Sequence, residues 1–394
     1  MFESMDKEFV LQTYPRNYVH FQKGNNATLY ADDGKDFIDF TSGIGVVSVG
    51  HGNERLANAL CDQAKNLIHT SNLFMIEPQA KLAKKISELC GYSVGTFFAN
   101  SGAEANEGAI KLARAYGAKN FTKRRYKIVT LEYSFHGRTI TTVKATGQSS
   151  FHDSKFAPYP DGFSFVSNLE DVYAALDDET VAVMLEIIQG EGGVSVFDKL
   201  ALQKLAQFLQ EKKVLLIVDE VQSGVFRSGE FLASQLYGLQ PDITTLAKGL
   251  AGGVPIGAVI SKHKDIFGVG DHGSTFGGNF LSTRAGCEVL DILDVYKKSG
   301  ELAVIINYFD TALQAFVRTC KATCKEAVGI GLMRGIRLRN GEMMGKILQA
   351  AFNEGVLVLK SGRGTLRFLP PLTISKNEID EGFTRLQNAF KKIS

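Results

Sequence analysis

Cysteine is scarce and irregularly placed in this chain of 394 residues. The five cysteines are an odd number, and only Cys320 and Cys324 lie close together in the sequence. No second ligand pair with the spacing of a zinc site accompanies them. This usage argues against a disulfide framework and predicts a protein of the reducing cytoplasm.

A strong net charge, long apolar runs and metal-binding histidine patterns are also missing. The net charge of +2 gives no general attraction for nucleic acid. The uncharged stretch from Gly249 to Ile260 is too short to span a bilayer, and the N-terminus lacks the basic and apolar segments of a signal peptide. We therefore expect no nucleic-acid partner, no membrane association and no metal.

The composition that is present, 44% hydrophobic and 22% charged residues, is ordinary for a globular protein with one large or two smaller cores. From Glu77 to about residue 275, short apolar runs alternate with helical patterns. This alternation predicts an α/β fold with a mostly parallel sheet covered on both faces. The apolar runs are residues 94–99, 127–131, 181–185, 214–218 and 258–261.

The two ends of the chain have a different pattern. Residues 27–30 and 37–40 flank an Asp-Gly turn and predict a hairpin. After residue 285 long helices dominate. We predict a large central domain and a smaller α+β domain built from both chain ends. The predicted divisions are an N-terminal arm with part of the small domain at 1–55, a large cofactor-binding domain at 56–284, and the rest of the small domain at 285–394.

The most informative segment begins with the apolar run that ends in Asp219. Lys248 follows 29 residues later in a small-residue setting. Pyridoxal phosphate (PLP) needs an acid facing its ring nitrogen and an amine that binds its aldehyde. An ion pair at about 3 Å and an effective dielectric near 20 is worth roughly 5 kcal/mol, enough to keep the ring protonated. Taken alone, Asp219 could equally pair with a local Arg or Lys.

Lys248 is also the candidate for the base that moves a proton on the substrate. A lysine can do this only if burial and a neighbouring positive charge lower its pKa.

A second motif could bind an anion. The apolar run at 94–99 leads into Ser101-Gly102-Ala103-Glu104 at the start of a helix. A strand, a small-residue turn and a helix N-terminus form an anion site, although the same pattern is typical of an ordinary helix cap.

Several segments resemble the class III aminotransferases, and the likeness extends over almost the whole chain. They are FFANSGAEANEGAIKLARAY, the Asp219–Lys248 stretch, QGEGG, HGSTFGGN and TLRFLPPL. The resemblance implies the type I fold of PLP-dependent transferases and a homodimer with shared active sites. It assigns the backbone of Gly102 and Ala103 to the cofactor phosphate, Phe135 to the ring face and Gln222 to the ring hydroxyl.

The same resemblance places Ser274 and Thr275 on a loop that reaches the active site of the partner subunit, with Thr275 at the phosphate and Ser274 beside the substrate. Tyr14 lies where the family has the mouth of the pocket.

For the substrates, the resemblance makes Arg138 the candidate that binds the α-carboxylate of an ornithine-type donor through a bidentate contact. Arg367 is the candidate for the α-carboxylate of glutamate, and Glu191 pairs with Arg367 when glutamate is absent. Either arginine could instead be a structural anchor. Glu186, at the end of an apolar run, is expected to support the pocket rather than react.

The reaction implied is transfer of the terminal amino group of N2-acetyl-L-ornithine to 2-oxoglutarate, giving N-acetyl-L-glutamate 5-semialdehyde and L-glutamate in arginine biosynthesis. SGIGV and ANSGAEANE are nearer to enzymes for acylated than for free ornithine. Gly45 stands where alanine is expected, which leaves more room at the acyl end.

The alternative donors are N-succinyl-diaminopimelate, succinylornithine, ornithine and 4-aminobutyrate. Two further alternatives are another PLP reaction, such as racemisation or decarboxylation, and a non-catalytic binding protein. The two-arginine arrangement argues against the first, and the presence of both Lys248 and Asp219 argues against the second.

Overall fold

The structure, a computed structural model, describes residues 2–393. The helices are α1 (Phe2–Phe9), α2 (Ser42–Gly45), α3 (Glu54–Asn66), α4 (Glu77–Cys90), α5 (Gly102–Asn120), α6 (Ile140–Ala145), α7 (Leu169–Ala175), α8 (Lys199–Lys212), α9 (Ala233–Leu236), α10 (Phe280–Ser299), α11 (Glu301–Thr319), α12 (Met344–Asn353) and α13 (Lys376–Ile393). The strands are β1 (Phe21–Asn25), β2 (Thr28–Ala31), β3 (Asp36–Asp39), β4 (Gly95–Ala99), β5 (Lys127–Leu131), β6 (Phe163–Val166), β7 (Thr180–Leu185), β8 (Ile188–Gln189), β9 (Ser195–Val196), β10 (Leu215–Asp219), β11 (Ile243–Leu246), β12 (Gly257–Ser261), β13 (Cys324–Ile330), β14 (Met333–Leu338), β15 (Val356–Leu357), β16 (Leu359–Ser361) and β17 (Thr365–Phe368).

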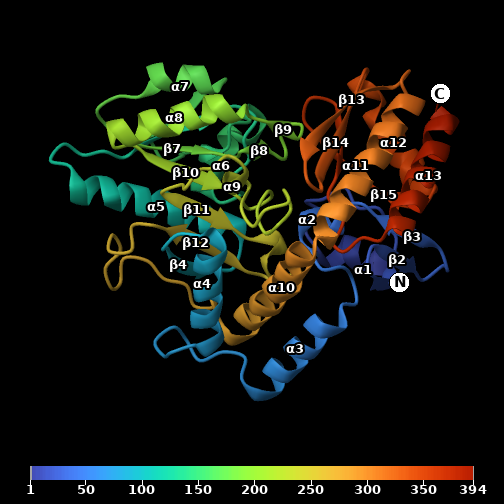
Figure 1. The fold of residues 1–394 in the computed structure, drawn as a ribbon, viewed down its shortest axis with the longest axis horizontal. Coiled ribbons are helices and arrows are strands. Elements are labelled where there is room, and N and C mark those ends of the chain that lie inside the picture. Colours follow the sequence, from blue (N-terminus) through green and yellow to red (C-terminus); the bar gives the residue numbers. More distant parts are fainter. Residues whose placement is uncertain (1, 394) are drawn as a thin grey trace.

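A seven-stranded sheet in the order β4-β12-β11-β10-β7-β5-β6 forms the centre of the larger region, on the left of Figure 1. Only β12 runs antiparallel to its neighbours. The carboxyl ends of the six other strands therefore lie along one edge of the sheet. The predicted fold class, α/β with a mostly parallel sheet, is confirmed.

Alternate residues of the central strands face two different cores. Leu216 and Val218 of β10 pack in a core with the buried leucines of α8, whereas Leu215 and Ile217 pack in a core with apolar residues of α5. Because both faces of the strand are buried, its sequence is continuously apolar. This is the pattern that made β10 recognisable in the sequence.

The predicted apolar runs are strands to within a residue at each end, but two strands of this seven-stranded sheet, β6 and β11, were missed. β11 carries Thr244 and Thr245, both buried, and the hydroxyl of Thr245 is used in a hydrogen bond to Asn106. β6 is an edge strand with a half-exposed pattern. Neither has the continuous apolar run by which the other strands were recognised.

The chain ends combine in the second region, on the right of Figure 1. The predicted hairpin is confirmed as β2 and β3, and β15 from near the C-terminus pairs in parallel with β3. The ring of Phe40 is fully buried and contacts the rings of Phe309, Phe368 and Phe383. One aromatic core thus joins the N-terminal strands to the C-terminal helices.

The predicted division at residue 284 falls inside α10, which runs from the larger to the smaller region in Figure 1. We propose that the division lies instead at Gly300. This residue has a left-handed φ of 85° and separates α10 from α11. Among residues 2–393, no helix is long and apolar enough to cross a membrane.

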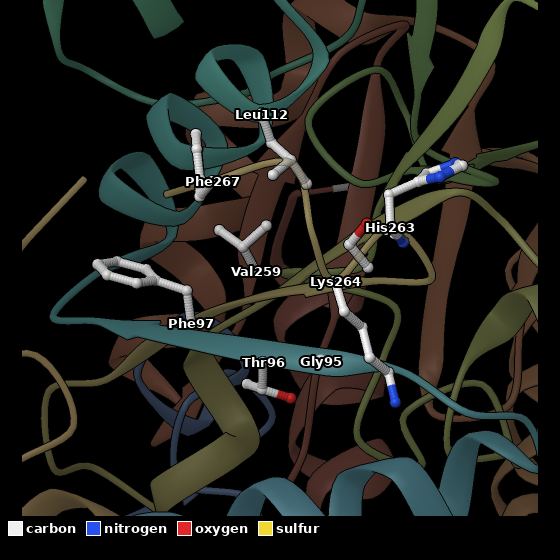
Figure 2. Close-up of a pocket in the computed structure, with 9 residues that line it drawn as sticks. Gly95, Thr96, Phe97, Leu112, Val259, His263, Lys264 and Phe267 are labelled. Carbon is white, nitrogen blue, oxygen red and sulfur yellow. Dashed lines mark hydrogen bonds between the residues drawn. The ribbon is translucent and has the colours of Figure 1, made fainter. Parts of the chain in front are cut away.

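A cavity of about 240 Å³ lies at the sheet edge opposite the carboxyl ends of the parallel strands. Figure 2 shows Phe97 of β4, Val259 of β12 and Leu112 of α5 around it. Lys264 extends away from these apolar side chains, and its Nζ donates to Ser93 Oγ at 2.6 Å. This cavity is therefore an apolar gap at the end of the sheet that does not carry Asp219.

Close backbone packing at Gly117 gives a test of the fold. A Cβ there would lie 2.0 Å from the carbonyl oxygen of Arg125, so α5 can approach β5 only with glycine. We expect Gly117→Ala to lower the free energy of unfolding by about 1–3 kcal/mol, although alanine is the better helix former by about 1 kcal/mol.

The matched control is Gly345→Ala in α12, where no atom lies within 4 Å of the added Cβ. It should leave the thermal unfolding midpoint unchanged or slightly raised. Equal midpoints for the two variants would contradict the close-packing argument.

Candidate active site

Five strand ends supply the candidate site. Asp219 is the last residue of β10, and Lys248 comes two residues after β11. Gly102 opens α5 after β4, His136 lies in the turn after β5, and Glu186 follows β7. Ligands of open α/β sheets bind at the carboxyl ends of the strands, where loops from several strands meet. The sheet topology therefore brings together residues that are far apart in the sequence.

Asp219 is a buried carboxylate with a full set of hydrogen-bond partners. Its Oδ2 lies 2.8 Å from Nδ1 of His136 and accepts from Nδ2 of Asn106 at 2.7 Å. Its Oδ1 accepts from the backbone N–H of Val221 at 3.0 Å and the hydroxyl of Thr245 at 3.3 Å. A buried charge is tolerated only when it is satisfied in this way. These contacts fix the direction of the carboxylate.

Asn106 and His136 were missed by the sequence analysis. Asn106 is 1% exposed and also donates to the backbone carbonyl of His136 at 2.7 Å. It thus ties α5 to the turn after β5 and to the end of β10. An amide on the apolar, buried face of α5 was the available signal, because a buried polar side chain needs specific partners.

Lys248 is half-buried and begins a short 3-10 turn after β11. Its φ of 38° is left-handed, a conformation that non-glycine residues adopt chiefly at functional sites. Burial is the largest cause that lowers the pKa of its ammonium to about 8, and the positive charge of Arg367 is the second. Among residues 2–393 the ammonium has no hydrogen bond or ion pair, so the amine is free to react.

Arg367 and Glu191 form an ion pair in which Nη1 lies 2.7 Å from Oε1. Arg367 is 2% exposed, while the side chain of Glu191 is 29% exposed. Gln222 contacts both partners, accepting from Arg367 at 3.1 Å and donating to Glu191 at 3.3 Å. A Cβ at Gly190 would lie 2.1 Å from Oε1 of Gln222. Gly190 is therefore required for this arrangement.

Glu186 joins two loops of the site. Its Oε1 accepts from the backbone N–H of Phe135 at 2.9 Å, and its Oε2 accepts from that of Gly190 at 3.2 Å. Burial raises the pKa of this carboxyl to about 7, with the charge of His136 acting in the opposite direction and that of Asp219 in the same direction. Glu186 holds the turn of Phe135 against the QGEGG loop.

Arg138 is exposed and held by aromatic rings alone. Its guanidinium carbon lies 4.2 Å from the ring centre of Phe151 and 5.6 Å from that of Phe135. It has no hydrogen bond or ion pair within the described part of the chain. Phe151 was also missed, because a single aromatic in a loop carries no sequence signal.

The start of α5 has the geometry of an anion site. Ser101 caps the helix by accepting from the N–H of Glu104 at 3.2 Å, which leaves the N–H groups of Gly102 and Ala103 without a partner among residues 2–393. A Cβ on Gly102 would lie 2.8 Å from the side chain of Val221. Glycine therefore lets the helix begin close to the loop that follows Asp219.

Three predicted residues are not joined to this cluster within the single chain. Tyr14 is 70% exposed, and its ring is contacted only by Arg16 among the described residues. Thr275 is exposed on its loop. Ser274 accepts from the side chain of Asn100 at 3.1 Å and from the N–H of Gly277 at 2.9 Å.

Comparison with known proteins shows the family of the chain. Residues 11–390 match the family model for aminotransferase class III. The chain belongs to the class III aminotransferases. It is 59% identical to an acetylornithine aminotransferase of Wolinella succinogenes, with 100% of each chain covered. It is 41% identical to an acetylornithine aminotransferase of Methanocaldococcus jannaschii, covering 99% of this chain and 98% of the relative.

Solved structures of this class have the same fold. An ornithine aminotransferase of Toxoplasma gondii superimposes with a TM-score of 0.92 at 31% identity, covering 100% of this chain and 94% of the other. Another structure of that protein, at a TM-score of 0.90 and the same identity and coverage, has PLP at partial occupancy in its active site. An N-acetylornithine aminotransferase of Stenotrophomonas maltophilia gives 0.82 at 31% identity, covering 99% and 98%. The fold is therefore that of the PLP-dependent aminotransferases.

The pKa of Lys248 offers a test of the charges around it. Arg367 lowers this pKa and Glu191 raises it. We expect Arg367→Gln to raise the pKa above about 8 and Glu191→Gln to lower it. The measurement is the pH dependence of Lys248 modification by trinitrobenzenesulfonate in cofactor-free protein, followed by peptide mass spectrometry. Midpoints that move in the same direction would show that these charges do not control the amine.

Proposed function

We propose that this class III aminotransferase transfers the terminal amino group of N2-acetyl-L-ornithine to 2-oxoglutarate. The products are N-acetyl-L-glutamate 5-semialdehyde and L-glutamate, a step of arginine biosynthesis in the cytoplasm. The observation that carries the proposal is the pair of arginines, since Arg138 is free while Arg367 is held by Glu191. The names of the curated relatives support acetylornithine as the donor.

The cofactor of the proposal is PLP, and the residues present fit it. The unpartnered amine of Lys248 suits the aldehyde, and the buried carboxylate of Asp219 suits the ring nitrogen. The free N–H groups of Gly102 and Ala103 suit the phosphate. Phe135 is proposed to cover one face of the ring.

Gln222, three residues after Asp219, is proposed to reach the ring hydroxyl. When bound, PLP supplies an aldehyde that condenses with amines and a protonated ring that withdraws electrons from the carbon being deprotonated.

Lys248 performs the proton transfer in this proposal. With a pKa of about 8, about a tenth of the amine is unprotonated at pH 7, far more than for an ordinary lysine. It would take the proton from the substrate carbon that bears the amino group and later release it. His136 and Asn106 hold the carboxylate of Asp219 in one orientation, so that the ring nitrogen meets a fixed charge.

Arg367 and Glu191 let one pocket receive two substrates. The reacting end of the donor carries an amine and no carboxylate, so Arg367 keeps its contact with Glu191. When 2-oxoglutarate enters, its α-carboxylate replaces Glu191 on Arg367. The Nε of Arg367 is buried with no partner among the described residues, and its N–H lies on the same side of the guanidinium as Nη2, so these two nitrogens can bind a carboxylate together. Glu191 is the more exposed partner and can move towards water.

Substitution of each arginine tests whether Arg138 binds the donor and Arg367 binds 2-oxoglutarate. A hydrogen bond to a charged group contributes about 1.5–3 kcal/mol, so losing a bidentate contact should weaken binding by about a hundredfold. We expect Arg138→Met to slow the half-reaction with N2-acetylornithine. Arg367→Met should slow the return half-reaction with 2-oxoglutarate more than it slows the half-reaction with N2-acetylornithine. Single-turnover absorbance of the lysine-bound cofactor measures both.

The same assay separates the alternative donors. Faster conversion by N-succinyl-diaminopimelate, ornithine or 4-aminobutyrate than by acetylornithine would replace the donor in this proposal. An enzyme that no amine converts would overturn the activity itself.

We further propose a homodimer with shared active sites. Support comes from an exposed apolar patch made by Leu73, Phe74, Met75 and Phe276, which are 87%, 67%, 98% and 60% exposed. These residues come from two loops, one with Leu73 and one with Phe276. Asn72 links the loops by donating to the carbonyls of Ser274 and Gly277 at 3.0 and 2.9 Å. Exposed apolar patches of this kind mark interaction sites.

The patch adjoins Ser274 and Thr275 in the sequence and in space. A second copy bound there would receive these two hydroxyl groups at its own site, Thr275 at the phosphate and Ser274 beside the substrate. Tyr14, exposed in the single chain, is proposed to complete the mouth of the pocket.

The double substitution Phe74→Asp with Met75→Asp should convert the dimer to monomers, because it places charges in an interface that must be dehydrated. Light scattering after size-exclusion chromatography gives the mass, and PLP absorbance gives cofactor retention, which should also fall. Val269→Asp, on a fully exposed residue outside the patch, is the control and should leave the mass unchanged. A wild-type protein that elutes as a monomer would remove the basis for shared sites.

A further inference from the structure

The turn that carries Glu191 is closed by a side chain from a distant part of the sequence. In a four-residue turn, the carbonyl of the first residue often accepts directly from the N–H of the fourth. In the turn at residues 190–193, the hydroxyl of Ser361 lies between these two groups. It donates to the carbonyl of Gly190 at 2.7 Å and accepts from the N–H of Gly193 at 2.9 Å. The conformation of the turn therefore depends on Ser361.

A second contact holds the backbone of Glu191 itself. The N–H of Gly362 donates to the carbonyl of Glu191 at 2.9 Å. A Cβ on Gly362 would lie 2.8 Å from that carbonyl oxygen, so glycine is needed for this approach. Both ends and the centre of the turn are thus bound to residues 361–362. The side chain of Glu191 is left as the part that can move.

The same hairpin carries Arg367. β16 and β17 pair in antiparallel fashion, with Ser361 of β16 opposite Thr365 of β17. The carbonyl of Gly190 accepts from Nη1 of Arg367 at 3.1 Å as well as from Ser361. A carbonyl oxygen can accept both bonds because it has two lone pairs. One hairpin therefore determines the position of both members of the ion pair between Glu191 and Arg367.

The two backbone groups that Ser361 bridges are buried. Gly190 and Gly193 both lie in the interior, so loss of the hydroxyl would leave the N–H of Gly193 without its acceptor. The turn would have to shift, either to bond to itself or to reach water. The carbonyl of Gly193 keeps its contacts with Thr365 and Arg337, at 3.3 and 3.2 Å. The loop should therefore stay folded while the direction of Glu191 changes.

We propose that Ser361 is a positioning residue that holds Glu191 against Arg367. Its hydroxyl thereby sets how readily a substrate carboxylate displaces Glu191. Without the hydroxyl, the ion pair is weaker and Arg367 is more accessible to carboxylates. This inference rests on the proposed function, because it takes Glu191 as the residue that the α-carboxylate of 2-oxoglutarate displaces.

Binding of glutarate to the holoenzyme, measured by isothermal titration calorimetry, tests the role of Ser361. Glutarate is a five-carbon dicarboxylate with no amino or keto group, so it binds without reacting. Ser361→Ala should lower its Kd about two- to tenfold, and Glu191→Gln about tenfold or more because the competing charge is gone. In the Glu191→Gln background, Ser361→Ala should have no further effect, since it acts through Glu191.

The amine of Lys248 gives a second measurement that does not depend on a ligand. The charge of Glu191 raises the pKa of Lys248. Ser361→Ala should therefore lower this pKa in the same direction as Glu191→Gln, by a smaller amount. The pH dependence of trinitrobenzenesulfonate modification at Lys248 measures it in the cofactor-free protein.

Ser195→Ala is the matched control. The hydroxyl of Ser195 donates to the carbonyl of Gly192 at 3.1 Å and accepts from Nη1 of Arg363 at 3.0 Å. It thus joins the same loop to the same hairpin without bridging the two ends of the turn. The variant should leave glutarate binding and the pKa of Lys248 unchanged. Equal effects of Ser195→Ala and Ser361→Ala would overturn the specific role of Ser361.

The remaining outcomes separate this inference from the proposed function. If Glu191→Gln strengthens glutarate binding and Ser361→Ala does not, the role of Ser361 is overturned while the proposed function stands. An effect of Ser361→Ala that persists in the Glu191→Gln background overturns it as well. If Glu191→Gln leaves glutarate binding unchanged, the exchange of Glu191 for a substrate carboxylate is wrong, and both proposals fail at that step.

Discussion

The need to satisfy one buried carboxylate and fix its direction organises this structure. Asp219 is 3% exposed. Its hydrogen-bond partners come from α5, from the turn after β5, from β11 and from the loop that follows β10. An unsatisfied charge at this depth would cost several kcal/mol. The strand ends around Asp219 must therefore keep a fixed spacing, which also determines where Lys248 and the start of α5 lie.

The second constraint is electrostatic and spans both regions of the chain. Arg367 belongs to β17, in the part of the structure built from the chain ends, yet it pairs with Glu191 from the loop after β8. Its charge also lowers the pKa of Lys248. Gln222 contacts both members of the pair. A substrate carboxylate that displaces Glu191 would therefore change the field at the reactive lysine as well as fill the pocket.

The two arginines of the candidate site differ in their surroundings. Arg367 is buried and paired, so in the proposed mechanism a substrate carboxylate has to displace Glu191. Arg138 is exposed and rests on Phe151, so it is available at all times.

The sequence alone determined the α/β class and most central strands, because apolar periodicity carries that information. It singled out Asp219 and Lys248 by their local setting, while the other candidate site residues came from the resemblance to the class III aminotransferases. It did not reveal β11, Asn106 or the stacking of Phe151 on Arg138. Tertiary structure decided these features. A buried threonine or asparagine is stable only through partners brought from other elements, and contacts between distant segments leave no periodic trace in a single sequence.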